Sequence, residues 1–395
     1  MPILNRIADF HAEMTAWRRD FHAHPETAFE EVRTSGIVAA KLREFGCDEV
    51  VTGIARTGVV GVIHGTKGGQ GGPGRAVGLR ADMDALPIQE QTGLAHASTI
   101  PGKMHACGHD GHTTMLLGAA RYLAETRNFA GTVYVIFQPA EEAGGGGNVM
   151  VQEGLFERFP MERVFGMHNW PGAPEGSFWW REGPIMAATA QIEVSITGKG
   201  AHGAMPHQGN DPVVVAAQIV TALQSIVARN VEPAESGVIT IGHIQGGDTW
   251  NVIPEQVTLR GTARWFKPEV GDLLERRFLD ISTGIATAFG ATAKAVFDRG
   301  YPATVNEPES TALTVEAARA IAGEAKVQEM PKPTMGGEDF AFMLNAKAGS
   351  YIMLGAGRGP ADPQVHHPKY DFNDAVLPVG ASYWARLAEQ LLAKG

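Results

Sequence analysis

The chain has 395 residues, of which 44% are hydrophobic and 19% are charged, and it contains 49 glycines. This length exceeds what one compact core needs, so we expect roughly two or three domains in an ordinary globular protein with many tight loops. The formal net charge of −10 argues against a nucleic-acid or anionic-membrane partner, because both require a basic protein surface.

The N-terminal segment (residues 1–26) lacks the basic start and the apolar stretch of a secretory signal. Apolar residues from Ile3 to Trp17 recur at helical spacing instead, which predicts an amphipathic helix. No continuous apolar run reaches the ~18 residues of a membrane span. Cys47 and Cys107 are too few for a disulfide framework, so we expect a cytoplasmic protein.

Up to about residue 185, short apolar segments alternate with helical patterns. This alternation is typical of an α/β domain whose mostly parallel sheet is covered on both faces. The predicted strands are 59–65, 76–82, 131–138 and 163–169, and a helix is predicted over 113–126.

From residue 186 to residue 298 the pattern changes. Apolar and polar residues alternate with period two over 190–200, 237–244 and 257–266, as in an antiparallel sheet with one exposed face. Helices are predicted over 211–230, where Asp211 is the N-cap and Pro212 lies in the first turn, and over 269–289, before a segment at 291–298. We therefore expect a separate inserted α+β domain.

After residue 299 the first pattern returns. It predicts helices over 310–323, 338–346 and about 380–393, and a strand over 350–357. The simplest interpretation is one domain made of 1–185 and 299–395, interrupted by the domain 186–298. Gly69, Gly71 and Gly74 have GxGxxG spacing, but Pro73 and the lack of a directly following helix predict a connecting loop instead of a dinucleotide site.

The segment MHACGHDGHTTML (104–116) concentrates metal-ligand types. Cys107 and His109 stand two residues apart, so in extended backbone both side chains point to one side, as a shared metal requires. A buried cysteine beside incidental histidines is the alternative. Further candidates follow other predicted parallel strands: Asp82, Asp84, Glu141, Glu142, His168 and His366. Because such strand ends meet at one edge of a sheet, their convergence favours a metal site over unrelated helix caps.

Adjacent residues at a strand end point in different directions, so Glu141 and Glu142 are expected to differ in role. One can bind metal while the other faces the attacking water. The thiolate and imidazoles favour zinc, although manganese, cobalt and nickel are compatible.

Eight segments, in order, resemble the M20 metallopeptidase family and in particular its amidohydrolase branch of hippurate hydrolases, N-acyl-amino-acid amidohydrolases and auxin-conjugate hydrolases. The segments are ADMDALPIQE, MHACGHDGHTTMLLGAA, FQPAEEAGGGG, GMHNWPG, GKGAHGAMPHQGNDPV, NVIPEQVTLRGTAR, MGGEDFAFML and HHPKYDFND. The resemblance implies a zinc-peptidase-like catalytic domain with an inserted dimerisation, or lid, domain. It also implies two divalent metal ions per subunit and a homodimer or tetramer formed through that insertion.

Matching positions imply five metal ligands: Cys107, His109, Glu142, His168 and His366. They imply that Glu141 is the general base and that Asp84 orients a ligand. Two divalent ions would then be only partly neutralised by the Cys107 thiolate, Glu142 and a hydroxide, and the remaining positive charge favours a substrate with a carboxylate. His367 leaves the terminal ligand open, and His105 and His112 are interpreted as helix-end or supporting residues.

The resemblance also assigns roles in the inserted domain. His202 is similar to a histidine that reaches the partner's active site and stabilises the developing oxyanion, whereas by itself it would be an ordinary surface residue. Asn251 is similar to a substrate-binding asparagine.

The implied reaction is hydrolysis of the amide bond of an N-acyl-amino acid, such as hippurate, to a carboxylic acid and a free amino acid. Deacetylation of N-acetyl-amino acids or N-acetyl-diaminopimelate, dipeptidase activity and a non-catalytic binding role are the alternatives, and Glu141 argues against the last. One group of side chains could form an aromatic acyl pocket or belong to the core: Trp170, Phe178, Trp179, Trp180 and Met186.

Overall fold

The computed structural model describes residues 3–67 and 75–393, so the predicted loop with Gly69, Gly71 and Gly74 lies outside the described residues. The chain forms two compact units. The larger unit comprises Met1–Ile185, Thr304–Pro333 and Asp339–Gly395, and the inserted unit comprises Met186–Ala303 and Thr334–Glu338. The second junction lies after Ala303 instead of the predicted 298, because the main-chain nitrogens of Gly300 and Tyr301 bond to Thr189.

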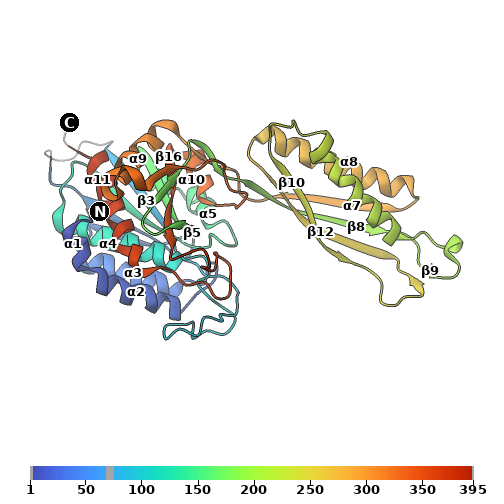
Figure 1. The fold of residues 1–395 in the computed structure, drawn as a ribbon, viewed down its shortest axis with the longest axis horizontal. Helices are drawn as coiled ribbons and strands as arrows, with labels where there is room; N and C mark the ends of the chain where they lie inside the picture. The colour runs from blue at the N-terminus through green and yellow to red at the C-terminus, as the bar shows by residue number, and fades with distance from the viewer. Residues whose placement is uncertain (1–2, 68–74, 394–395) are drawn as a thin grey trace. The chain divides into compact units, whose positions relative to one another are not determined.

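The larger unit is built on an eight-stranded sheet of order β1-β2-β4-β3-β5-β16-β6-β15 (Figure 1). Its strands are β1 (Glu49–Ile54), β2 (Gly58–His64), β3 (Ala76–Asp82), β4 (Thr132–Gln138), β5 (Arg163–Pro174), β6 (Phe178–Trp180), β15 (Val327–Glu329) and β16 (Gly349–Gly357). The run β4-β3-β5-β16 is parallel, whereas β1 and β2 pair antiparallel, as do β2 with β4 and β6 with β16. The predicted α/β fold with a mostly parallel sheet is confirmed.

Both faces of this sheet are covered, as the alternation along β3 illustrates. Leu79 and Ala81 belong to the core that includes α4 and α11, whereas the guanidinium of Arg80 lies over the ring of Phe340 in α10. The helices of the unit are α1 (Asn5–Asp9), α2 (His11–Ala23), α3 (Val32–Glu44), α4 (His109–Thr126), α5 (Gly146–Gln152), α6 (Leu155–Arg158), α9 (Pro308–Ala322), α10 (Phe340–Ala346) and α11 (Leu377–Leu391). Short elements complete it: β7 (Gly183–Met186), which pairs with β14 (Thr304–Asn306), and the 3-10 turns η2 (Glu324–Lys326) and η3 (Asp374–Val376).

Helix α4 begins four residues before the predicted position 113. Its N-cap is Gly108, whose φ of +94° is a left-handed conformation that a glycine adopts without a steric penalty. The earlier start places His109 and His112 in the first turn of the helix, beside the carboxyl end of β3.

The inserted unit is an antiparallel sheet of order β10-β12-β8-β13, with α7 and α8 packed on one face (Figure 1). Its elements are β8 (Ala188–Thr197), β9 (Ala201–His202), η1 (Pro206–Gln208), α7 (Pro212–Arg229), β10 (Gly237–Gln245), β11 (Val252–Ile253), β12 (Gln256–Trp265), α8 (Pro268–Ala288) and β13 (Thr292–Arg299). The predicted N-cap of α7 is confirmed, since Asp211 Oδ1 accepts from the nitrogen of Val213 at 2.9 Å. This unit matches the predicted α+β pattern.

Within the part of the chain that the structure describes, one helix, α7, has the length and the apolar composition needed to cross a membrane. The sequence prediction did not anticipate this feature. Core helices pass the same test, and α7 packs against α8, β10 and β12. Its buried side chains recur at helical spacing, including Val215, Ile219, Leu223 and Ile226. Length and composition are therefore weak evidence for a membrane span here.

Candidate metal centre

The carboxyl ends of β3 and β4 lie at the same level as His168 in β5. Asp82 pairs with Gln138, and Arg80 pairs with Gly166, two residues before His168. The expected end of β5 near residue 169 is corrected, because the strand continues to Pro174 alongside β16 and places His168 in its middle. The predicted convergence at this edge nevertheless brings the candidate side chains together.

Two groups of potential ligands overlap at one cysteine. The first consists of Cys107, His109 and His168, and the second consists of Cys107, Glu142 and His366. Within each group the ligand atoms lie within 4.8 Å of one another. The five sequence-predicted ligands thus form two adjoining sets that share the Cys107 sulfur, which is an arrangement suited to two cations.

The imidazoles are already oriented for binding. His168 donates from Nδ1 to the carbonyl oxygen of Asn169 at 2.6 Å, so its Nε2, 3.3 Å from the Cys107 sulfur, carries the lone pair. His109 Nδ1 lies 3.2 Å from Asp84 Oδ1, and its Nε2 is buried without a hydrogen-bond partner among the described residues. Glu142 Oε1 is likewise buried without a hydrogen-bond partner among the described residues. Buried atoms of this kind need a partner, and a cation between them would supply it, so the residues fit a metal.

His366 and His367 have different surroundings. The nitrogen of His366 donates to the carbonyl oxygen of Ala106 at 2.7 Å, which ties its segment to the one carrying Cys107. His366 Nε2 lies 3.4 Å from Glu142 Oε1. His367 instead accepts from the nitrogen of Lys369 through Nδ1 at 3.1 Å, so it closes a local turn. The geometry favours His366 as the terminal ligand.

The two glutamates after β4 point in different directions. Glu142 faces His109 and His366, while Glu141 Oε1 accepts from the nitrogen of Asp339 at 3.4 Å. The nitrogen of Glu142 donates to Asp84 Oδ2 at 2.9 Å, so Asp84 holds both this loop and His109. Glu141 is buried beside the ligand groups, in a position from which a carboxylate can accept and release a proton.

The charges of the cluster depend strongly on burial. Burial raises the pKa of the Cys107 thiol well above its ordinary value, and the carboxylate of Glu142 adds to the effect. Burial alone lowers the pKa of His109, but Asp82 and the hydrogen bond to Asp84 outweigh it and raise the pKa to about 10. Both residues therefore hold a proton near neutrality that a metal ion would have to displace.

His112 forms a further potential ligand group with Asp82 and His109, whereas His105 is in none of the groups found among the described residues. His112 donates from Nδ1 to Asp82 Oδ1 at 2.6 Å and accepts from the nitrogen of Asn169 through Nε2 at 2.9 Å, so both ring nitrogens are used. His105 is buried, which lowers its pKa to about 4, and its ring nitrogens have no hydrogen-bond partner among the described residues. His112 thus supports the site through Asp82 and Asn169.

Three supporting residues were not found from the sequence. Asn169 donates from Nδ2 to the carbonyl oxygen of Cys107 at 2.6 Å, and its own side chain is held by the hydroxyl of Tyr370, which donates to Oδ1 at 2.7 Å. Glu31 accepts from the nitrogen of Ala140, in the loop of the two glutamates, at 2.9 Å. Each partner is more than 60 positions away along the chain, and no local pattern reports such a contact.

His202 and Asn251 lie in the inserted unit, whereas the candidate ligands belong to the larger unit. The pairing of β9 with β11 sets His202 opposite Val252, and the carbonyl oxygen of Asn251 accepts from the nitrogen of Gly203 at 2.7 Å. Both side chains are exposed. The structure thus places these two predicted residues next to each other.

The aromatic segment is mainly part of the core. Phe178 is fully buried, with its ring 5.1 Å from that of Tyr383, and the side chains of Trp179 and Trp180 are half-buried in or beside β6. Trp179 donates from Nε1 to the Ser177 hydroxyl at 3.0 Å. These contacts favour the core interpretation over an acyl pocket.

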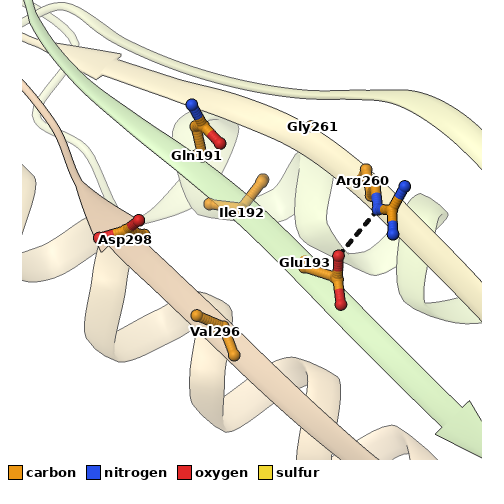
Figure 2. A pocket seen from close by; sticks show the side chains of 7 residues that line it. All are labelled: Gln191, Ile192, Glu193, Arg260, Gly261, Val296 and Asp298. Carbon is orange, nitrogen blue, oxygen red and sulfur yellow. Dashed lines mark hydrogen bonds and ion pairs between the residues drawn. The ribbon is translucent and has the colours of Figure 1, made fainter. Parts of the chain in front are cut away.

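A surface hollow in the inserted unit is a separate feature (Figure 2). It is lined by Gln191, Ile192, Glu193, Arg260, Gly261, Val296 and Asp298. Arg260 Nε donates to Glu193 Oε2 at 2.8 Å across neighbouring strands, and both side chains are exposed enough for water to screen them. None of the lining residues belongs to the candidate ligand groups, so the chemistry is assigned to the cluster around Cys107.

Comparison with known proteins identifies the family. The model of peptidase family M20/M25/M40 matches residues 78–390, a range that contains all five candidate ligands. The chain belongs to this family. Its M20 membership agrees with the resemblance of the sequence segments and with the α/β fold.

Several known proteins are similar to this chain over most of their length. The chain is 40% identical over 392 residues to the hippurate hydrolase of Campylobacter jejuni, covering 99% of this chain and 100% of that protein. It is 40% identical over 380 residues to the N-acetyl-L-cysteine deacetylase of Bacillus subtilis, covering 96% and 88%. The solved structure of the Bacillus subtilis YXEP protein, described as a dinuclear metal-binding peptidase from the M20 family, superposes with a TM-score of 0.82 at 34% identity, covering 98% and 99%. The chain is accordingly an M20 hydrolase of the amidohydrolase type.

Proposed function

We propose that the protein is a metal-dependent amidohydrolase that cleaves the amide bond of N-acyl-amino acids and releases a carboxylic acid and a free amino acid. One observation carries this proposal. Two ligand groups share Cys107, and a further buried carboxylate, Glu141, lies beside them but turns toward Asp339. A protein that only bound an acyl-amino acid would have no need for that second glutamate.

The proposed ligands of two divalent ions are Cys107, His109, Glu142, His168 and His366. A thiolate with imidazoles favours zinc, and the carboxylate also suits manganese, cobalt or nickel. When bound, such ions would act as Lewis acids toward the amide carbonyl and the attacking water. Asp84 would keep the His109 ring and the Glu142 backbone in place through its two carboxylate oxygens.

Glu141 is the proposed general base. Its carboxylate would accept a proton from the attacking water as the water adds to the amide carbonyl, and would then deliver that proton to the leaving nitrogen. The bond between the acyl carbon and the nitrogen breaks, so one water and one amide yield one acid and one amine. The nitrogen of Asp339 donates to Glu141 Oε1 at 3.4 Å, and this contact helps to hold the carboxylate beside the ligand groups.

The proposed enzyme is a homodimer, or a tetramer, associated through the inserted unit. Helix α7 supports this assembly, because it carries no charged residue from Pro212 to Ala228 and leaves Val213 and Val214 46% and 47% exposed. In that assembly, His202 would come from the neighbouring subunit to stabilise the oxyanion, and Asn251 would bind substrate. The two free cysteines support a cytoplasmic location.

The acyl group remains the main choice to test. Relatives with the same identity of 40% include a hippurate hydrolase and an N-acetyl-L-cysteine deacetylase. The excess charge of two divalent ions over their proposed ligands favours a substrate with a carboxylate, which both hippurate and N-acetyl-L-cysteine carry. Of the two we favour hippurate, because the similarity to the hippurate hydrolase covers 99% of this chain and 100% of that protein.

The experiment is a panel of hippurate, N-acetyl-methionine, N-acetyl-cysteine, N-acetyl-diaminopimelate and simple dipeptides, read by amino-acid release from the zinc- and the manganese-loaded protein. We expect hippurate to have the highest kcat/KM. Release from the acetyl compounds alone would assign a deacetylase, and no release from any compound with either metal would refute the amidohydrolase proposal.

A further inference from the structure

A buried carboxylate next to the metal cluster has no part in the mechanism described above. Glu31 immediately precedes α3 and is 0% exposed. Its Oε1 accepts from the nitrogens of Ala140 at 2.9 Å and Phe29 at 3.0 Å, and its Oε2 accepts from the hydroxyl of Thr57 at 2.6 Å. One carboxylate thus joins its own segment, which includes Phe29, to the segments of Thr57 and Ala140, and these three segments are distant from one another in sequence. Of these, only the segment of Ala140 carries candidate catalytic and metal-binding residues.

The backbone at Ala140 is in an unfavourable conformation. Its φ of +54° lies in the left-handed region, which is sterically unfavourable for a residue with a Cβ atom. Glu141 and Glu142 follow directly, so the direction of both carboxylates depends on this turn. Such a conformation persists only when surrounding contacts hold it, and the hydrogen bond from the Ala140 nitrogen to Glu31 is one such contact.

The segment of Glu31 holds the same loop at a second point. A Cβ atom added at Gly144, whose φ is +110°, would lie 2.6 Å from Cε2 of Phe29. The ring of Phe29 therefore packs directly on the loop, while the Phe29 nitrogen is itself bound by Glu31. Through these contacts Glu31 links the beginning of the loop, at Ala140, to the part covered by Phe29.

We propose that Glu31 is a positioning residue that holds the Ala140 turn and thereby aims Glu141 toward the reacting water and Glu142 toward the metal ions. This inference rests on the proposed function and adds to it a residue that touches neither metal nor substrate. Thr57 has a subsidiary part, because its hydroxyl fixes the second oxygen of Glu31.

The variants follow from the contacts. Glu31→Ala removes the acceptor and leaves the Ala140 and Phe29 nitrogens buried without it. Glu31→Gln keeps one carbonyl oxygen for both nitrogens and should have a smaller effect. Thr57→Val removes the hydroxyl at nearly constant volume, and Thr57→Ser retains it. Glu26→Ala is the matched control, because Glu26 accepts from the nitrogens of Arg33 and Thr34 at the start of α3, and within the described part of the chain its carboxylate does not hydrogen-bond to the glutamate loop.

Two measurements apply to each variant. The first is kcat and KM on the best substrate of the panel, and the second is a titration with Co²⁺ alone, followed by the absorption of the cobalt–thiolate bond. We expect Glu31→Ala to lower kcat about 10- to 100-fold with KM changed less than about threefold, and to lower the Co²⁺ affinity at least about tenfold. Thr57→Val should move both quantities in the same direction, Thr57→Ser should restore them, and Glu26→Ala should leave them within about twofold.

The inference is overturned if folded Glu31→Ala retains the wild-type kcat and Co²⁺ affinity, or if Glu26→Ala loses as much of either. If Glu31→Ala does not fold, the test is the comparison of Thr57→Val with Thr57→Ser. Equal kcat and equal Co²⁺ affinity for these two variants would overturn the inference. The Co²⁺ titration needs no substrate. A wild-type protein that cleaves nothing in the panel would therefore refute the proposed function while the titration still tests Glu31.

Discussion

Asp84→Asn is the sharpest test of the candidate metal centre, because both oxygens of this buried carboxylate accept from groups that can only donate. Oδ1 lies 3.2 Å from His109 Nδ1, which must carry hydrogen if Nε2 is to bind a metal. Oδ2 accepts from the main-chain nitrogen of Glu142 at 2.9 Å. An asparagine offers one oxygen and one amide group, so in either orientation one donor faces another donor.

The size of the effect follows from that mismatch. A buried donor left without an acceptor costs about 1–3 kcal/mol, and loss of the carboxylate charge beside His109 acts in the same direction. Because about 1.4 kcal/mol corresponds to a tenfold change, the substitution should lower metal affinity roughly 10- to 100-fold. The disturbance reaches one proposed ligand through its ring and another through its backbone.

The assay is competition between the protein and a chelator for Zn²⁺, with Co²⁺ absorption as an independent measure. Asp48→Asn is the control, since Asp48 also accepts from a main-chain nitrogen, that of His64, and lies outside the candidate ligand groups. The control should bind metal like the wild type. An Asp84→Asn protein that is folded and binds both metals within about twofold of the wild type would refute the assignment of His109 and Glu142 as ligands oriented by Asp84.

Three further predictions follow. Mixing equal amounts of Glu141→Ala and His202→Ala subunits should restore about a quarter of the wild-type activity, because about half of the dimers are then hybrids and each hybrid has one site with an intact base and an intact histidine. Activity no higher than the sum of the parents would count against the shared site. Metal binding should release close to two protons, from Cys107 and His109, and the metal affinity should rise with pH toward about 10. Calorimetry in buffers of different ionisation enthalpy would measure the proton release, and release of no protons at pH 7 would contradict the raised pKa values. Burial lowers the pKa of His22, but hydrogen bonds to two carboxylates outweigh it and raise the pKa from an ordinary 6.5 to about 9. The protonated His22 therefore contributes roughly 3 kcal/mol to the free energy of unfolding. This contribution is complete below pH 6.5 and is lost as the pH rises through 9. The stability difference between wild type and His22→Gln in urea unfolding should therefore shrink over that range, and a difference independent of pH would show that His22 is neutral in the folded protein.

Much of the architecture could be predicted because it depends on local patterns. Period-two alternation identified β8, β10 and β12, and the Asp-Pro pair at 211–212 located the start of α7. The short spacing of Cys107 and His109 also indicated a shared ligand role, and the two residues do fall in one potential ligand group. The extended backbone assumed for this prediction was wrong, because Gly108 is left-handed and His109 begins α4.

Other features required the folded chain. The sequence contains both His366 and His367, but only the hydrogen bond from the His366 backbone to Ala106 brings one of them to Glu142. The prediction that His168 would end its strand was wrong, because pairing with β16 prolongs β5 to Pro174.

The sequence by itself determined the types of element, their order and the residues with metal-binding chemistry, since these depend on periodicity and side-chain composition. The resemblance implied that Asp84 orients a ligand, but only the tertiary structure decided which atoms each supporting group contacts: Asp84 on His109 and the Glu142 nitrogen, Asn169 on Cys107 and Glu31 on Ala140. Such contacts join segments separated by 25 to 109 positions, and hydrogen-bond geometry over that separation exists only after the sheet and helices have packed.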